Sequence, residues 1–178
     1  MASIGLRVKT GKAFAIAVSG THGALRAVLR DEVALADRTV IDTVHPYHLE
    51  IEGRPESVAA AVRTSKQIGK AALKRLFDAV GRVEGIEFIT VVVNTHTPPE
   101  RITSPHMRAH GKEGWLFREI CERAAETRGV EPLTLSIDEL PLDARATKNA
   151  LVALGDAFGR PWTADWKLAA AAAWTRLR

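Results

Sequence analysis

Residues 86–114, IEFITVVVNTHTPPERITSPHMRAHGKEG, decide the fold of this chain. The stretch begins with a nearly continuous apolar run that has the length of a strand and is rich in β-branched residues, which is typical of a central strand covered on both faces. Pro98 and Pro99 prevent regular structure from continuing beyond it. Ligands of open α/β sheets usually bind just past the carboxyl ends of such strands, so Asn94 and His96 are candidate site residues.

The second half of this stretch indicates the start of a helix that carries two histidines. Ser104 suits the capping position and Pro105 the first helical position. His106, His110 and Glu113 follow at helical spacing and share one face of the predicted helix. Two neutral imidazoles and a carboxylate can bind a divalent transition metal, and without a metal the histidines can donate protons or contact phosphate.

A plainer interpretation of these histidines stays open. Their HxxxH spacing lacks the flanking glutamate of a metalloprotease motif, and Gly111 and Gly114 predict an irregular first turn. In that case the histidines are only polar surface and capping residues. In the metal interpretation, His96 can approach as a further ligand.

Length and composition predict one globular domain over residues 1–178. Hydrophobic residues make up 46% of the chain, which excludes a disordered protein. No apolar run approaches the about 20 residues of a membrane span, and the first residues do not resemble a signal peptide. The single cysteine, Cys121, excludes an internal disulfide and a multi-cysteine zinc site. We therefore expect a cytoplasmic protein without a membrane partner.

The net charge of +4 and the pI of about 9.5 permit binding to nucleic acid or phosphate without requiring it. The strongest run of positive charge lies on a long helix predicted over residues 57–80. Lys66, Lys70 and Lys74 repeat there at intervals of one turn. This ridge can follow a phosphate backbone, although such a ridge is more often a solvated face.

Three strands precede that helix, over residues 3–9, 13–18 and 24–35, and short turns join them into an antiparallel meander. Residues 36–56 are predicted to be an irregular loop that contains His45-Pro46-Tyr47-His48. Long loops in compact domains are often functional, but Tyr47 and Leu49 favour a loop that is pinned over a sheet edge. The sequence leaves the role of the two histidines open.

The chain after the central strand predicts three helices and one more strand. One helix begins at Pro105 or Trp115 and ends at Arg128, a short strand covers residues 133–137, and a helix covers about 142–158. Thr163 caps the last helix, whose run of alanines predicts close packing against the sheet or another helix.

This order of elements resembles the ribonuclease H-like fold, which Holliday-junction resolvases of the RuvC type, retroviral integrases and actin-like ATPases share. The segments SPHMRAHGKEGWLFRE and GRPWTADWKLAAAAAW also look like a bacterial family of this fold that lacks the usual catalytic acids and for which the resemblance implies no particular activity. The likeness covers about residues 3–177. It implies an α/β fold with a mixed five-stranded sheet, three antiparallel strands followed by two further strands, and helices on both faces.

The resemblance also implies where a nuclease would carry its acids: an aspartate on the first strand, a carboxylate at the end of the fourth, and one or two acids near the last helix. These acids hold two metal ions that activate water and stabilise the leaving oxygen. Here the first strand has no acid, and Lys9 stands near the expected aspartate. The fourth strand ends at Asn94, and only Asp165 stands where a family acid is expected. The phosphate-binding loop of the actin-like ATPases is missing too.

The fold brings these positions together, so we expect one cleft at the edge of the sheet. Its candidate catalytic residues are His96, Asp165 and Asn94, and its candidate phosphate-binding residues are Lys9 and Lys12. An alternative role of Asp165 is only to favour the positive end of its helix.

The sequence supports three functional hypotheses. The first is binding of a nucleic acid or a nucleotide phosphate, with divergent phosphodiester hydrolysis that can use a divalent metal. The second is a non-catalytic interaction or scaffold protein that has lost the acids. The third is a metalloenzyme that uses His106, His110 and Glu113. Substrate, metal identity and oligomeric state are left open.

Overall fold

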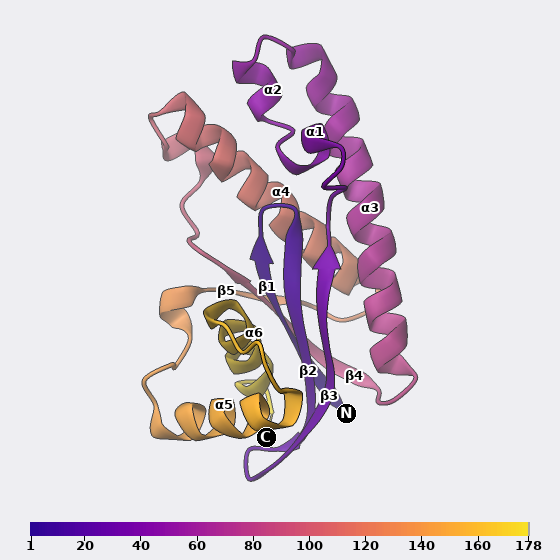
Figure 1. Cartoon of the computed structure of the whole chain (residues 1–178), viewed down its shortest axis with the longest axis vertical. Coiled ribbons are helices and arrows are strands. Elements are labelled where there is room, and N and C mark those ends of the chain that lie inside the picture. Colours follow the sequence, from indigo (N-terminus) through magenta and orange to yellow (C-terminus); the bar gives the residue numbers. More distant parts are fainter. Residues whose placement is uncertain (178) are drawn as a thin grey trace.

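The computed structural model describes residues 1–177, and a five-stranded mixed sheet lies at its centre (Figure 1). The strand order is β3-β2-β1-β4-β5. The strands are β1 (Ala2–Lys9), β2 (Lys12–Thr21), β3 (Ala24–Ala34), β4 (Ile86–Val93) and β5 (Leu133–Ser136). Strands β1, β2 and β3 pair antiparallel, whereas β4 pairs parallel with both β1 and β5. The predicted meander and buried central strand are therefore confirmed.

Helices cover both faces of the sheet. On one face lie α3 (Pro55–Gly81) and α4 (Pro105–Thr127), and on the other lie α5 (Arg145–Phe158) and α6 (Ala164–Trp174) (Figure 1). The larger core, between the sheet and the α3–α4 layer, contains Leu73, Phe77 and Phe117. The smaller core, on the α6 side, is built on Ile16 and Trp166. The mixed sheet with helices on both faces is the architecture that the sequence predicted.

Strand β1 has two different faces, which decides what each helix layer meets. Ala2, Ile4, Leu6 and Val8 belong to the larger core. Alternation along the strand turns the intervening residues, including Gly5, to the other face. The close approach of α6 requires glycine there, because a Cβ at residue 5 would lie 1.9 Å from the backbone oxygen of Ala169. The alanine run of α6 thus packs closely against the sheet, as predicted.

The segment between β3 and α3 differs from its prediction. Instead of one irregular loop it contains two short helices, α1 (Ile41–Val44) and α2 (His48–Ile51). It packs mainly against α3 and α4, and Val44 and Tyr47 also contact the larger core. Leu49 is buried there, and Val44 lies next to the β1–β2 turn, where a Cβ at Gly11 would come 3.2 Å from Cγ1 of Val44. The apolar side chains that predicted a pinned loop instead anchor these two helices to the long helices.

Helix α4 begins at Pro105, and Ser104 caps it by accepting a hydrogen bond from the backbone N–H of Met107 at 3.4 Å. The predicted irregular first turn is not present, because the helix runs unbroken through Gly111 and Gly114. Close packing explains why residue 111 is a glycine, because a Cβ there would lie 2.7 Å from Cδ1 of Ile102.

Three further details complete the fold. Short 3-10 turns, η1 (Pro99–Arg101) and η2 (Ile137–Glu139), follow β4 and β5. Helix α5 begins at Arg145, later than predicted, because residues 141–144 form a turn. Within residues 1–177, no helix combines the length and the hydropathy that crossing a membrane requires.

Candidate functional site

The carboxyl ends of β1 and β4 meet the first turn of α6, and Arg7 lies at this junction. The Arg7 side chain is almost completely buried. Its Nε donates a hydrogen bond to Oδ1 of Asp165 at 3.3 Å, and one Nη donates to the backbone oxygen of Val92 at 3.4 Å. The other Nη donates to Oδ1 of Asn94. Arg7 thus joins the two strands and the helix, and we call Arg7, Lys9, Asn94 and Asp165 the sheet-end site.

Burial and ion pairing act in opposite directions on Arg7. Removal from water lowers the pKa of the Arg7 guanidinium below its ordinary value, while the hydrogen bond and the charge of Asp165 raise it. An arginine stays protonated in proteins under these conditions. The sheet-end site therefore contains a fixed positive charge that is held against one carboxylate.

The structure brings together only part of the predicted cleft. Lys9 reaches Asp165 with its Nζ at 3.7 Å, so Lys9, Asn94 and Asp165 do lie around one point, with Arg7 between them. Lys12 instead pairs with Glu32 at 3.0 Å, on the neighbouring strand β3.

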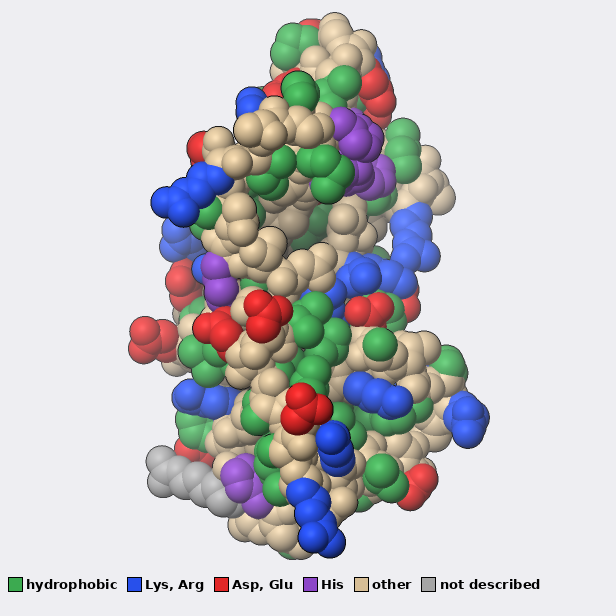
Figure 2. Space-filling view, turned by 90° about the vertical axis from the view of Figure 1, so that its left-hand side faces the viewer, with side chains coloured by type: hydrophobic (Ala, Val, Ile, Leu, Met, Phe, Trp, Pro, Cys, Tyr) green, Lys and Arg blue, Asp and Glu red, His purple; other side chains and the backbone are tan. Residues whose placement is uncertain are grey.

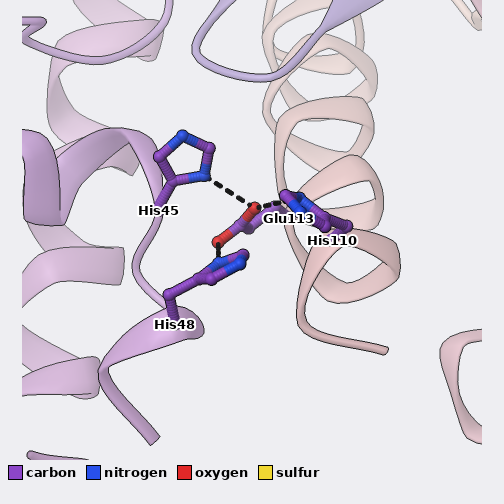
Figure 3. Close-up of side chains that lie close together, drawn as sticks. All are labelled: His45, His48, His110 and Glu113. Atoms are coloured by element: carbon purple, nitrogen blue, oxygen red, sulfur yellow. Dashed lines mark hydrogen bonds and ion pairs between the residues drawn. The ribbon is translucent and has the colours of Figure 1, made fainter. Parts of the chain in front are cut away.

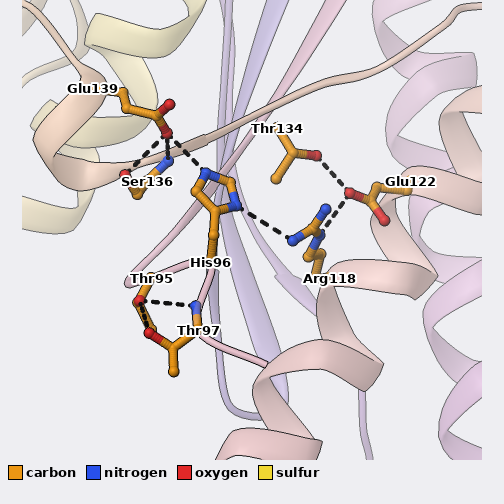
Figure 4. Close-up of polar contacts among 8 residues, drawn as sticks. All are labelled: Thr95, His96, Thr97, Arg118, Glu122, Thr134, Ser136 and Glu139. Carbon is orange, nitrogen blue, oxygen red and sulfur yellow. Dashed lines mark hydrogen bonds and ion pairs between the residues drawn. The ribbon is translucent and has the colours of Figure 1, made fainter. Parts of the chain in front are cut away.

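His96 belongs to a separate polar network beyond the end of β5 (Figure 4). Its Nε2 lies 2.8 Å from Oε2 of Glu139, and its Nδ1 lies 3.5 Å from a guanidinium nitrogen of Arg118. Ser136 donates to the same Glu139 oxygen from its backbone N–H at 2.6 Å and its hydroxyl at 2.9 Å. The backbone bond of Ser136 and the bond to His96 lower the pKa of Glu139 to about 2. His96 is thus held by a carboxylate that stays ionised.

The second concentration of titratable groups lies where the α1–α2 segment meets α4 (Figure 3). The carboxylate of Glu113 is completely buried and faces three imidazoles. The Nδ1 atoms of His45, His48 and His110 lie 3.0, 2.7 and 3.4 Å from its oxygens. One ligand atom from each of these four residues lies within 4.8 Å of the others, so the group could hold a metal ion.

His106 lies beside His110 on α4, as its spacing predicted, but it is not one of the four residues whose ligand atoms gather within 4.8 Å of one another. Its Nε2 lies 3.3 Å from Nε2 of His110, on the side of that ring away from Glu113. His110 and Glu113 share one face as predicted, and His45 and His48 join them from the segment whose role the sequence left open. His96, bound to Glu139, is outside this group. We call Glu113 and the four histidines His45, His48, His106 and His110 the histidine cluster.

Local packing fixes the two segments that build the histidine cluster. Thr43 accepts a hydrogen bond from the backbone N–H of Asp37 at 2.9 Å, and its backbone oxygen accepts one from the Ser65 hydroxyl of α3 at 2.7 Å. Lys112, beside Glu113, pairs with Glu50 of α2 at 2.8 Å. These contacts fasten the α1–α2 segment to both long helices.

Two grooves with basic walls lie on opposite faces of the sheet. One, of about 640 Å³, lies between α5 and α6 and is lined by Lys148, Arg160, Trp162 and Lys167, with Asp156 as its acid. The other lies between α3 and α4, and its walls carry five cations and one acid: Lys66, Lys70, Lys74, Arg123, Arg128 and Glu119. On the side of the molecule that Figure 2 shows, one group of histidines lies in the upper part and other histidines lie lower down, while lysines and arginines are spread among acidic residues.

Sequence reasoning missed Arg7 and the partners of Glu113. Arg7 gave no distinct signal, because the first strand alternates between apolar and other residues and Arg7 occupies one of the alternate positions. The partners of Glu113 gave no local signal, since His45 and His48 lie 68 and 65 positions away along the chain.

No protein-family model and no curated protein matches this chain. Solved structures do match. The chain is similar to RuvC from T. thermophilus in complex with a Holliday junction substrate, with 11% sequence identity and a TM-score of 0.61 over 98% of this chain and 91% of that one. A second Thermus thermophilus RuvC structure matches with 13% identity and a TM-score of 0.56, over 98% and 92% of the two chains. At these identities the likeness establishes the fold, which is the ribonuclease H-like fold that the sequence resemblance predicted.

Proposed function

We propose that this chain binds the phosphates of a nucleic-acid strand beside the sheet-end site and does not hydrolyse them through a pair of metal ions held there. The observation that carries the proposal is the buried guanidinium of Arg7, bound to both Asn94 and Asp165. A positive charge of the protein thus stands where the resemblance implies carboxylates that hold cations.

The residues present do not fit a two-metal centre. Two divalent ions require several carboxylates, whereas the sheet-end site offers one, and Oδ1 of that carboxylate already accepts a hydrogen bond from Arg7. Asn94 is a neutral amide, and Lys9 adds a second positive charge. Divalent cations are repelled by this net positive charge, whereas a phosphate is attracted to it.

The groove between α5 and α6 has the chemistry that a single strand requires. Lys148, Arg160 and Lys167 supply positive charge for phosphates, and Trp162, whose ring stacks with Phe158, adds aromatic surface to the groove wall that a base can contact. Asp165 and Lys167 both lie at the start of α6, so this helix contributes one residue to the sheet-end site and one to the groove. The similar RuvC structure is a complex with a Holliday junction substrate, which agrees with nucleic-acid binding on this fold.

The test is fluorescence anisotropy with labelled single-stranded, duplex and four-way-junction oligonucleotides over a range of salt concentrations. Wild type is expected to bind the single strand with an affinity that falls as salt rises. The variant Lys148→Gln, Arg160→Gln, Lys167→Gln is expected to bind at least about 10-fold more weakly and to reduce the magnitude of the salt slope by about 2, since each lost phosphate contact contributes about 0.7.

A matched control removes three charges from the other face of the sheet, as Lys66→Gln, Lys70→Gln, Lys74→Gln. An equal loss in both triple variants would show attraction by net charge alone, and a loss only in the control would move the site to the α3–α4 groove. No binding by wild type would leave the non-catalytic interaction protein as the function. Cleavage of the oligonucleotides with Mg²⁺ or Mn²⁺ that disappears in Asp165→Asn would refute the non-hydrolytic part.

A further inference from the structure

Glu113 is a buried carboxylate whose partners are unusual. Its side chain is completely buried, and within residues 1–177 its ion-pair partners are all histidines. The neighbouring Lys112 points instead to Glu50. A buried carboxylate without a positive partner is costly, so buried charges are paired with cations or coordinate metals. A histidine is positively charged only when it is protonated, so the histidine cluster lacks a permanent cation.

We propose that a divalent transition-metal ion supplies this charge. It binds one carboxylate oxygen of Glu113 and the Nδ1 atoms of His45, His48 and His110. Three imidazole nitrogens and one carboxylate oxygen suit zinc and its neighbours in the first transition row, rather than Mg²⁺ or Ca²⁺, which prefer oxygen ligands. Of these four ligands, the sequence predicted His110 and Glu113. The α1–α2 segment adds His45 and His48.

The distances fit four-coordinate binding after small side-chain movements. Metal–ligand bonds of about 2.0–2.1 Å in a tetrahedron place the ligand atoms about 3.3 Å apart. The three Nδ1 atoms already lie 2.7 to 3.4 Å from oxygens of Glu113, with His45 and His110 nearest Oε2 and His48 nearest Oε1. One ligand atom from each of the four residues lies within 4.8 Å of the others, so modest rotation of the rings brings four ligands to one ion. His45, His48 and His110 are partly exposed, which gives the ion access from solvent.

His106 has a positioning role. When Nδ1 of the neutral His110 ring binds metal, its proton is on Nε2. That nitrogen lies 3.3 Å from Nε2 of His106, which can accept the hydrogen bond. Metal-bound histidines usually donate their second N–H to such a partner, which fixes the ring and its tautomer.

The bound ion would act as a clamp. Two ligands come from the α1–α2 segment and two from α4. Four protein ligands leave no open coordination position, which is typical of structural rather than catalytic sites. Metal binding therefore fastens residues 41–51 to the first turns of α4.

The experiment titrates Zn²⁺, Co²⁺, Mg²⁺ and Ca²⁺ separately into metal-stripped full-length protein by calorimetry, with a Co²⁺ absorption spectrum to report geometry. Wild type is expected to bind one Zn²⁺ or Co²⁺ per chain, with tetrahedral cobalt bands, and to bind neither Mg²⁺ nor Ca²⁺. At a 100-fold excess of Zn²⁺ over Kd, the Tm is expected to rise by about 5–10 °C. Hydrogen exchange of residues 41–51 should slow when zinc is added.

Matched variants distinguish the metal ligands from histidines that do not bind the ion. His45→Asn, His48→Asn in one chain is expected to lose the cobalt bands, the Tm shift and the slowed exchange. His22→Asn, His96→Asn, which changes the two histidines outside the cluster, is expected to keep all three. His106→Asn should keep the cobalt bands and bind about 10- to 100-fold more weakly. Circular dichroism checks that each variant is folded.

Absence of stoichiometric Zn²⁺ or Co²⁺ binding in wild type would overturn the proposal, as would binding that survives in the folded His45, His48 double variant. Loss in the His22, His96 control would assign the ion to other ligands. If hydrogen exchange of residues 41–51 does not change on metal binding, the ion does not hold this segment against α4. None of these results depends on nucleic-acid binding, so the metal-site proposal and the proposed function are tested independently.

Discussion

Nε of Arg7 lies 3.3 Å from Oδ1 of Asp165, and this bond joins residues 158 positions apart across the first strand and the last helix. Arg7 is buried, whereas a quarter of the Asp165 side chain is exposed. The contribution of this pair to the free energy of unfolding should therefore lie between two cases. A surface ion pair contributes little, whereas removing one partner of a fully buried pair strongly destabilises the fold.

Removing one partner of the Arg7–Asp165 pair should destabilise the fold. Asp165→Asn leaves a buried guanidinium without its carboxylate, and we expect the free energy of unfolding to fall by about 2–4 kcal/mol, below the largest values for buried pairs because solvent screens Asp165. Lys9→Met removes the more exposed cation beside the same carboxylate. It should lower the free energy of unfolding by less than about 1 kcal/mol. Urea denaturation measures both variants, and equal losses would contradict a dominant role for Arg7.

Gly5 should not tolerate a methyl group. In Gly5→Ala the new Cβ would lie 1.9 Å from the backbone oxygen of Ala169, so α6 must move away from the sheet. We expect a loss of about 2–4 kcal/mol in the free energy of unfolding. The matched control is Gly114→Ala, where the methyl group meets open space on the surface of α4, and it should stabilise the protein by about 0.5–1 kcal/mol. Thermal denaturation of the pair tests this, and a tolerated Gly5→Ala would mean that α6 is not held so closely.

Glu139 should contribute to stability in a way that acid removes. Its pKa is lowered from 4.5 to about 2, so between these pH values the unfolded chain binds more protons than the folded one. The contribution of Glu139 is therefore fully present above about pH 4.5 and is lost as the pH falls towards 2. Carboxyl-resolved NMR of Glu139 should show a midpoint near pH 2, and a midpoint near 4.5 would contradict the bonds from Ser136 and His96.

Denaturation of variants gives a second test of Glu139. Wild type should be more stable than Glu139→Gln at pH 6, and the difference should shrink when both are measured near pH 2.5. Glu131→Gln, a change at an exposed position, serves as the control and should follow wild type at both pH values.

Cys121 should be unreactive in the folded protein. It is completely buried between α4 and the sheet core, and burial raises the pKa of its thiol, which disfavours the reactive thiolate. A thiol reagent at pH 8 is expected to modify native protein only as fast as the protein opens, and to modify the chain at once in denaturant. Rapid modification under native conditions would show that α4 separates readily from the core.

Local patterns predicted most of the fold because the forces behind them act over short stretches of chain. The β-branched run over residues 86–93 became β4, and Ser104 with Pro105 began α4 at the predicted residue. The errors arose where contacts distant in sequence override local preference. Gly111 is tolerated in α4 because Ile102 packs against it, and residues 36–56 form short helices because Leu49 and Val44 find partners on other elements.

For the candidate site, too, the sequence determined some features and the tertiary structure decided others. The sequence by itself determined which chemical groups are available: a first strand without an acid, Asn94 at the end of the fourth, Asp165 on the last helix, and paired histidines on α4. Only the tertiary structure decided which groups meet. It placed Arg7 between Asn94 and Asp165, and it brought His45 and His48 to Glu113 across more than 60 positions of chain. The physical reason is that hydrogen bonds and ion pairs act over a few ångströms, and the packing of helices on the sheet sets which distant residues come within that range.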